Sequence, residues 1–123
     1  MVDTTELVGN ARGSAMEVAR LQRLLLLGDE LGISPIVAAE FMAGVRLDER
    51  PYWRAFLQTF TCWAVTFEDG LLAGEWQHEY RARGIQLALP DLLIAATAIR
   101  VGAVLLTSNV KDFPMPGLAL SRE

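Results

Sequence analysis

Oxygen-bearing side chains stand near the points where apolar segments of this sequence begin or end. The set comprises Asp3, Glu40, Asp91, Asn109 and Asp112. Carboxylates brought close together raise one another's pKa unless a cation neutralises them. Mg²⁺ and Mn²⁺ are hard cations that prefer oxygen ligands and keep some of their water. Such an ion activates water and neutralises a phosphate, so the set predicts phosphodiester hydrolysis if the chain brings its members together.

Each acid also has an ordinary structural explanation. Taken singly, Asp3 and Asp91 are as consistent with helix N-caps as with metal ligands. Asp112, in the segment "NVKDFP", is by itself more typical of a loop acid. Glu40 lies in the apolar stretch "VAAEFMAGV", where an unpaired buried carboxylate would cost several kcal/mol, so we expect it to have a partner. The metal-site interpretation therefore depends on the joint pattern.

The elements that must position these residues alternate between short strands and helices. Helical periodicity covers residues 15–27, 36–46, 50–60, 68–83 and 92–101. Strands are expected to end near Val2 and at Ser34, and to cover residues 62–67, 104–108 and 118–120. The alternation predicts an α/β fold with a mostly parallel sheet, in which Val2 ends a central strand. The working site of such a sheet lies at the carboxyl ends of its strands.

Composition narrows the class of protein further. The 123 residues predict one domain, residues 1–123, with a net charge of −4 that argues against a broad basic surface for nucleic acid. One cysteine, Cys62, and one histidine, His78, exclude both an intramolecular disulfide and a zinc site with nitrogen and sulfur ligands. The sequence has no apolar run long enough for a membrane span and no secretory signal pattern, so we expect a cytoplasmic protein. Neither GxSxG nor GxxxxGK[ST] is present.

Several blocks of the sequence resemble PIN-domain ribonucleases of the VapC toxin class. The segment "LPDLLIAATAIRVGAVLLTSNVKDFPMPGLAL" is similar to the family's C-terminal block, and "GISPIVAAEFMAGVR" to its central block. The segment "AGEWQHEYRARG" is similar to its connecting helix, and "VDTT" to its opening motif. The resemblance implies a PIN-like three-layer sandwich in which helices flank a short, mostly parallel central sheet.

The resemblance also implies a function and a ligand set. The family's metal-binding acids fall on Asp3, Glu40 and Asp91, and its fourth acidic position falls on Asn109, with Asp112 as the nearest carboxylate. Thr4 and Thr107 would support the site. The implied protein is a homodimeric endoribonuclease toxin that uses Mg²⁺ or Mn²⁺ to cleave RNA. Its partner would be a VapB-like antitoxin, through which alone the pair would contact DNA.

Two departures from the family pattern leave other functions open. Only Met1 and Val2 precede Asp3, where the family has a longer apolar strand, and Glu6 replaces an apolar residue of the opening motif. Together with Asn109 at the fourth acidic position, these departures motivate an alternative in which the catalytic edge has decayed and the chain is a binding module. A small-molecule phosphoesterase that uses the same metals is a further alternative.

Overall fold

The computed structural model describes residues 1–3, 32–107 and 109–121, so the predicted helix at 15–27, Thr4 and Glu6 lie outside the described residues. The described helices are α3 (Pro35–Ala43), α4 (Arg50–Leu57), α5 (Phe67–Ala82) and α6 (Leu89–Val101). The strands are β1 (Gly32–Ile33), β2 (Thr61–Cys62), β3 (Leu105–Leu106) and β4 (Leu120–Ser121). Short 3-10 turns cover Leu47–Glu49 and Val110–Asp112.

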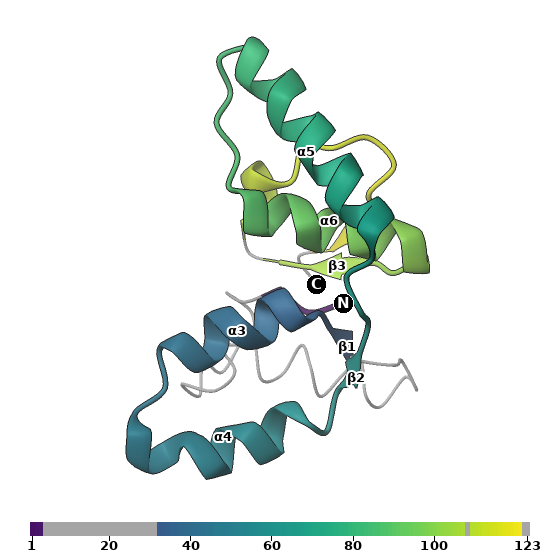
Figure 1. Ribbon diagram of the computed structural model, residues 1–123. Helices are drawn as coiled ribbons and strands as arrows, with labels where there is room; N and C mark the ends of the chain where they lie inside the picture. The colour runs from purple at the N-terminus through teal and green to yellow at the C-terminus, as the bar shows by residue number, and fades with distance from the viewer. Residues whose placement is uncertain (4–31, 108, 122–123) are drawn as a thin grey trace.

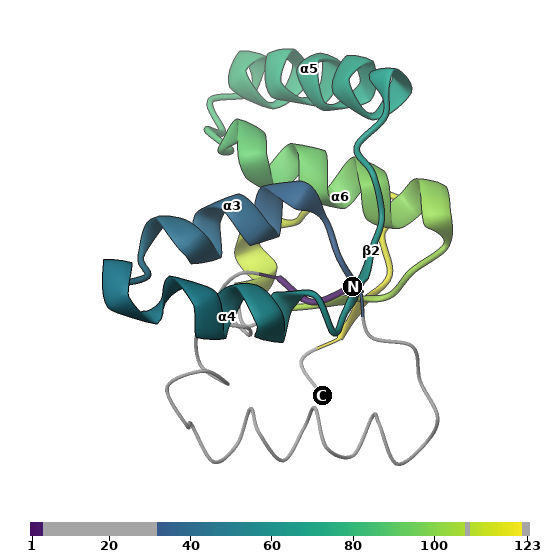
Figure 2. The same cartoon turned by 60° about the horizontal axis from the view of Figure 1, so that its bottom comes forward.

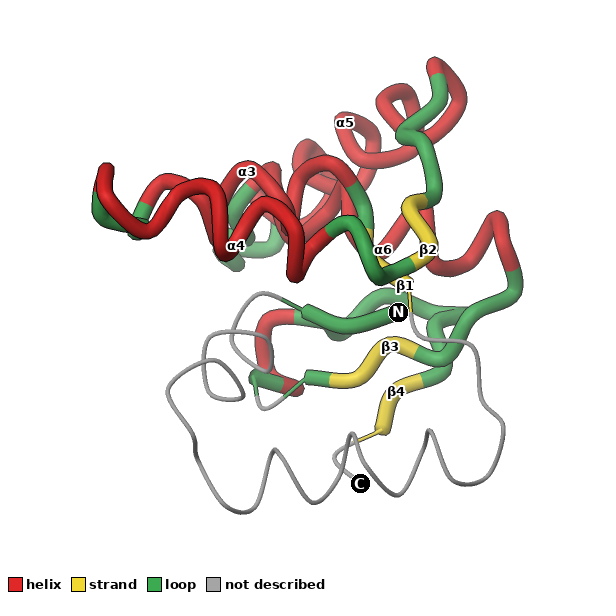
Figure 3. The backbone as a smooth tube through the Cα atoms, turned by 90° about the horizontal axis from the view of Figure 1, so that it is seen from below, coloured by secondary structure: helices red, strands yellow, loops and turns green. Residues whose placement is uncertain are grey.

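The first three residues join two parallel strand pairs into one sheet (Figure 3). β1 pairs with β2 and β3 with β4, both in parallel register. The Val2 N–H donates to the Gly32 carbonyl at 2.8 Å on one side. On the other side the Leu106 N–H donates to the Met1 carbonyl at 2.8 Å, and the Asp3 N–H donates to the Leu106 carbonyl at 3.0 Å. The predicted parallel sheet with Val2 on a central strand is therefore confirmed.

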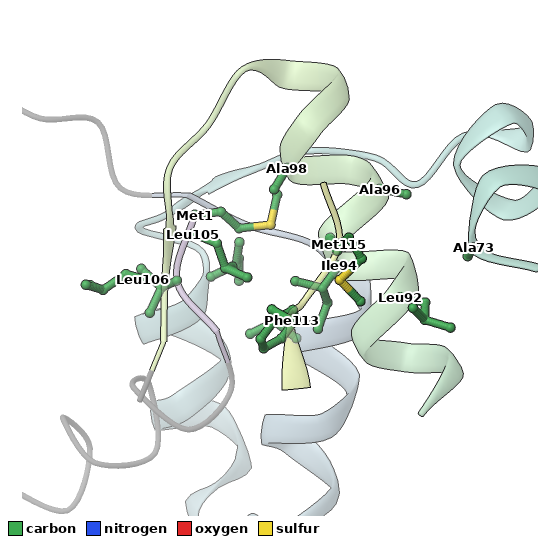
Figure 4. Close-up of a cluster of buried hydrophobic side chains, with 14 of the residues drawn as sticks. Met1, Ala73, Leu92, Ile94, Ala96, Ala98, Leu105, Leu106, Phe113 and Met115 are labelled. Atoms are coloured by element: carbon green, nitrogen blue, oxygen red, sulfur yellow. The ribbon is translucent and has the colours of Figure 1, made fainter. Parts of the chain in front are cut away.

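The described helices lie on one side of β3 and β4 in Figure 3, and Figures 1 and 2 show α6 next to α5. α6 is apolar nearly all round because it is packed on both sides, against α5 and against the strands, and Leu92, Ile94 and Ala98 are fully buried. Figure 4 shows side chains of α6 meeting Met1 and Leu105 of the sheet. The burial predicted for residues 92–101 is confirmed, and it fixes the position of the helix that carries Asp91.

The strand predicted at 62–67 is shorter than expected because a helix signal interrupts it. The Thr66 hydroxyl accepts a hydrogen bond from the Asp69 N–H at 3.2 Å, and the Asp69 carboxylate accepts one from the Thr66 N–H at 2.9 Å. This capping box starts α5 at Phe67 and outweighs the β-branched and aromatic content of the segment. The helix predicted at 50–60 likewise ends earlier, at Leu57. No helix in the described ranges has the length and apolar character to cross a membrane.

Candidate active site

Asp3 and Thr107 lie side by side at the carboxyl ends of adjacent strands. Both are buried, with exposed fractions of 4% for Asp3 and 0% for Thr107. The Thr107 Oγ1–H donates to Asp3 Oδ2 at 2.8 Å, and Thr107 Oγ1 accepts from the Asn109 N–H at 3.0 Å. The parallel register between residues 1–3 and β3 brings the two side chains together. Thr107 therefore holds the Asp3 carboxylate in a fixed orientation.

Asp91 lies in the first turn of α6 and is not its N-cap. The N-cap is Ala88, which makes no side-chain capping bond, so the capping explanation of Asp91 is wrong. Burial, followed by the charges of Asp3, Asp112 and Glu40, raises the pKa of Asp91 to about 6. The helix N-terminus favours a negative charge, but burial and the like charges outweigh it. Three acids therefore lie near enough to Asp91 to act on it electrostatically, and we call these four residues the acidic cluster.

The remaining predicted residues come from two segments: Glu40 from α3, and Asn109 and Asp112 from the turn after β3. Glu40 comes from α3, whose start is fixed by Ser34: the buried Ser34 hydroxyl accepts from the Val37 N–H at 3.3 Å. Glu40 itself is exposed, so the prediction of a carboxylate on a buried apolar face is wrong and no large desolvation cost applies. Asp112 ends the 3-10 turn after β3 and is half-buried, while Asn109 binds Thr107 through its backbone.

Ser34 was not among the residues predicted from the sequence. It is a fully buried polar residue at the end of β1. The signal that identifies it is the dipeptide Ser34–Pro35, because Ser is a preferred N-cap and Pro is favoured in the first helical turn. Its role in the described structure is to orient α3, and with it Glu40.

The donor set fits an open metal site. Within the described ranges, no three carboxylate, imidazole or thiolate groups converge closely enough to enclose a metal ion by themselves. Mg²⁺ is usually bound through one or two carboxylates, with waters and substrate phosphates completing its octahedron. Acids that raise the pKa of Asp91 without closing into a cage suit that mode, because a cation would relieve their repulsion and keep water ligands.

Comparison with known proteins assigns the family. A model of the PIN domain matches residues 1–114. The chain belongs to the PIN-domain family. The predicted PIN-like α/β fold is thereby confirmed.

Several relatives of this PIN domain are named VapC ribonucleases. Ribonuclease VapC19 of Mycobacterium tuberculosis is 37% identical over 115 residues, which cover 94% of this chain and 92% of that protein. Ribonuclease VapC10 of the same organism is 35% identical over 118 residues, covering 94% and 86%. VapBC2 from Rickettsia felis, bound to a DNA fragment from its promoter, superposes with a TM-score of 0.82 at 27% identity, covering 98% of this chain and 96% of that one. The predicted resemblance to VapC-type PIN domains is confirmed.

Proposed function

We propose that this chain is a divalent-metal-dependent endoribonuclease that acts as the toxin of a toxin–antitoxin pair. Its family and its relatives, which are named ribonucleases, support assignment to the nucleases, a class of hydrolases. The observation that carries the proposal is the cluster of acids around Asp91 at the carboxyl end of the sheet. Mg²⁺ is the proposed ion, and Mn²⁺ is expected to substitute for it.

We assign each residue a role from its place in the fold. Asp3 and Asp91 would bind the ion, and Asp112 would complete the set because its charge acts on Asp91. Asn109 would support the site through the hydrogen bond from its N–H to Thr107 Oγ1. Glu40 would bind the ion from the solvent side through a water molecule. A bound divalent ion supplies an activated water and neutralises the phosphate. The chain needs no histidine for this chemistry, and its one histidine, His78, is exposed on α5.

The solved relatives support the antitoxin partner of the proposed assembly. The R. felis protein and the VapBC-1 protein from nontypeable Haemophilus influenzae, with a TM-score of 0.79, are both VapBC structures. We propose a VapB-like antitoxin as the partner, with DNA contacted only through it, and a homodimer of the toxin. An exposed free thiol at Cys62 suits a reducing cytoplasm, where RNA is available.

The test is cleavage of a structured RNA by the purified chain. Cleavage should require Mg²⁺ or Mn²⁺, stop with EDTA and be lost in Asp91→Asn. Asp48→Asn is the matched control, because Asp48 is exposed and pairs with Arg46 on the surface at 3.0 Å. Cleavage that persists in Asp91→Asn, or in EDTA, would overturn the proposal.

Two further measurements separate the alternatives. Absence of Mn²⁺ binding at millimolar metal in calorimetry would favour a decayed binding module. Faster turnover of a chromogenic phosphodiester than of RNA would favour a small-molecule phosphoesterase.

A further inference from the structure

α5 ends in a hydrogen-bonded turn that carries two exposed arginines, Arg81 and Arg83. Gly84 adopts a left-handed conformation with φ of +78°, which suits glycine. Its N–H donates to the Arg81 carbonyl at 2.9 Å, and the Ile85 N–H donates to the Tyr80 carbonyl at 2.9 Å. These two bonds form a Schellman motif, which ends the helix and turns the chain back along it. The positions of Arg81 and Arg83 are therefore set by backbone hydrogen bonds.

A polar hollow of about 330 Å³ lies inside this turn. Its lining comprises Gln77, Arg81, Ile85, Gln86 and Leu87. One guanidinium and two amides together offer several N–H donors, which suit phosphate oxygens and base edges. Among the described carboxylates, none forms an ion pair with Arg81 or Arg83.

Arg83 extends this surface with a planar group. Its guanidinium carbon lies 4.6 Å from the centre of the Tyr80 ring. That ring is buried, and its hydroxyl donates to the Pro114 carbonyl at 3.3 Å, so the platform under Arg83 is fixed. Arg83 is exposed, and a guanidinium plane held in this way can stack on an unpaired base.

One lining residue of the hollow, Leu87, is close to the acidic cluster in the sequence. Leu87 precedes Asp91 by four residues, which span at most about 14 Å even when fully extended. Figure 2 shows the loop from α5 leading directly into the start of α6. An acidic cluster in a chain of net charge −4 repels RNA, so affinity requires cations next to it.

We propose that Gln77, Arg81 and Gln86, together with Arg83, form an RNA subsite for the single-stranded segment that flanks the cleaved bond. Arg81 and the glutamines bind its phosphates, and Arg83 stacks on a base. The inference rests on the proposed ribonuclease function. It adds to that function the place where substrate binds outside the metal site.

Arg81→Gln tests the subsite, and Arg54→Gln is the matched control because Arg54 also stands exposed in the last turn of a helix, α4. We expect Arg81→Gln to raise KM for an RNA oligonucleotide roughly tenfold with kcat unchanged. Turnover of bis(p-nitrophenyl) phosphate should not change, because so small a substrate does not reach the hollow. Arg81→Lys should restore part of the affinity, and Arg54→Gln should match the wild type.

RNA binding without metal gives an independent readout. Fluorescence anisotropy in EDTA over a range of KCl concentrations should show that Arg81→Gln reduces the slope of log K against log salt by about 0.7. Equal KM and equal slopes for Arg81→Gln and Arg54→Gln would overturn the subsite and leave Arg81 as a residue that stabilises a helix end. If the wild type cleaves neither RNA nor the small phosphodiester, the proposed function fails, while the anisotropy measurement still decides the subsite.

Discussion

Replacing Thr107 by valine removes the contact that orients the Asp3 carboxylate. The wild-type hydroxyl donates to Asp3 Oδ2 at 2.8 Å and accepts from the Asn109 N–H at 3.0 Å. Thr107 and Asp3 are 0% and 4% exposed, so bulk solvent does not reach the contact in place of the lost hydroxyl. Valine has nearly the same shape, and the substitution therefore isolates the two hydrogen bonds.

The expected loss follows from these contacts. A hydrogen bond to a charged group contributes about 1.5–3 kcal/mol. The Asn109 N–H is only partly buried, so leaving it unpaired adds about 1 kcal/mol. Together they predict that the free energy of unfolding falls by about 3 kcal/mol. If Asp3 binds the metal, removal of the group that orients it should weaken Mn²⁺ binding by about 10- to 100-fold.

The assay combines urea unfolding with calorimetric titration of Mn²⁺. Thr107→Ser is the control because it keeps the hydroxyl and loses only a methyl group, at a cost of about 0.8 kcal/mol. Thr107→Val with lower stability and unchanged Mn²⁺ affinity would refute Asp3 as a metal ligand. Unchanged stability would refute the strength assigned to the buried hydrogen bond.

Three further predictions test other parts of the structure. Burial and neighbouring charges raise the pKa of Asp91 to about 6. Activity at subsaturating metal should therefore fall about tenfold per pH unit below pH 6 and level off above it. Activity that stays constant down to about pH 4 would contradict this prediction. Asp69→Ala removes the buried acceptor of the hydrogen bonds that join α5 to α6 and should cost about 3 kcal/mol in urea unfolding, whereas the exposed Glu68→Ala should stay within about 0.5 kcal/mol of the wild type; equal losses would argue against the network. Gly32→Ala would place a methyl group against the Trp63 ring and should cost about 1–3 kcal/mol with a change in tryptophan fluorescence; wild-type stability and spectrum would show that the ring moves freely.

Asp69, whose hydrogen bonds join α5 to α6, has a lowered pKa, whereas the pKa of Asp91 is raised. Burial of Asp69 acts to raise its pKa, but hydrogen bonds from Thr66 and Arg100 outweigh it and hold the pKa below its usual value. Arg100 Nε lies 3.0 Å from Asp69 Oδ1, and Arg100 Nη2 donates to the Ala64 carbonyl at 2.6 Å. A carboxyl with a lowered pKa stabilises the fold above its unfolded-state value. This contribution disappears as the pH falls through the folded-state value.

The sequence was sufficient where one local rule decided the outcome. An apolar run without a polar face predicts a buried helix, and α6 is buried as predicted. The sequence could not explain why a charged residue, Arg100, stands in that apolar run, because its partner Asp69 is 31 positions away in the sequence. Partners at that separation depend on how α5 and α6 pack, and local periodicity does not encode that packing.

Predictions from the sequence were wrong where two local signals competed. They were also wrong where the polar and apolar residues of a helix did not show which of its faces is buried. The β-forming residues after Cys62 predicted a strand, but the capping box of Thr66 and Asp69 starts a helix instead. The apolar neighbours of Glu40 predicted burial, yet Glu40 is exposed because only part of α3 is covered in the described structure. Asp112, taken singly, is typical of a loop acid; the resemblance made it a candidate for the site, and in the fold its charge acts on Asp91.

The central claim is that separated carboxylates share one divalent ion at the carboxyl end of the sheet. Anomalous diffraction from crystals soaked in Mn²⁺ tests it most directly. We predict a peak bonded directly to Asp91 and to at least one of Asp3 and Asp112, with Glu40 on its solvent side. A peak on another surface, or none at a saturating Mn²⁺ concentration, would contradict the claim.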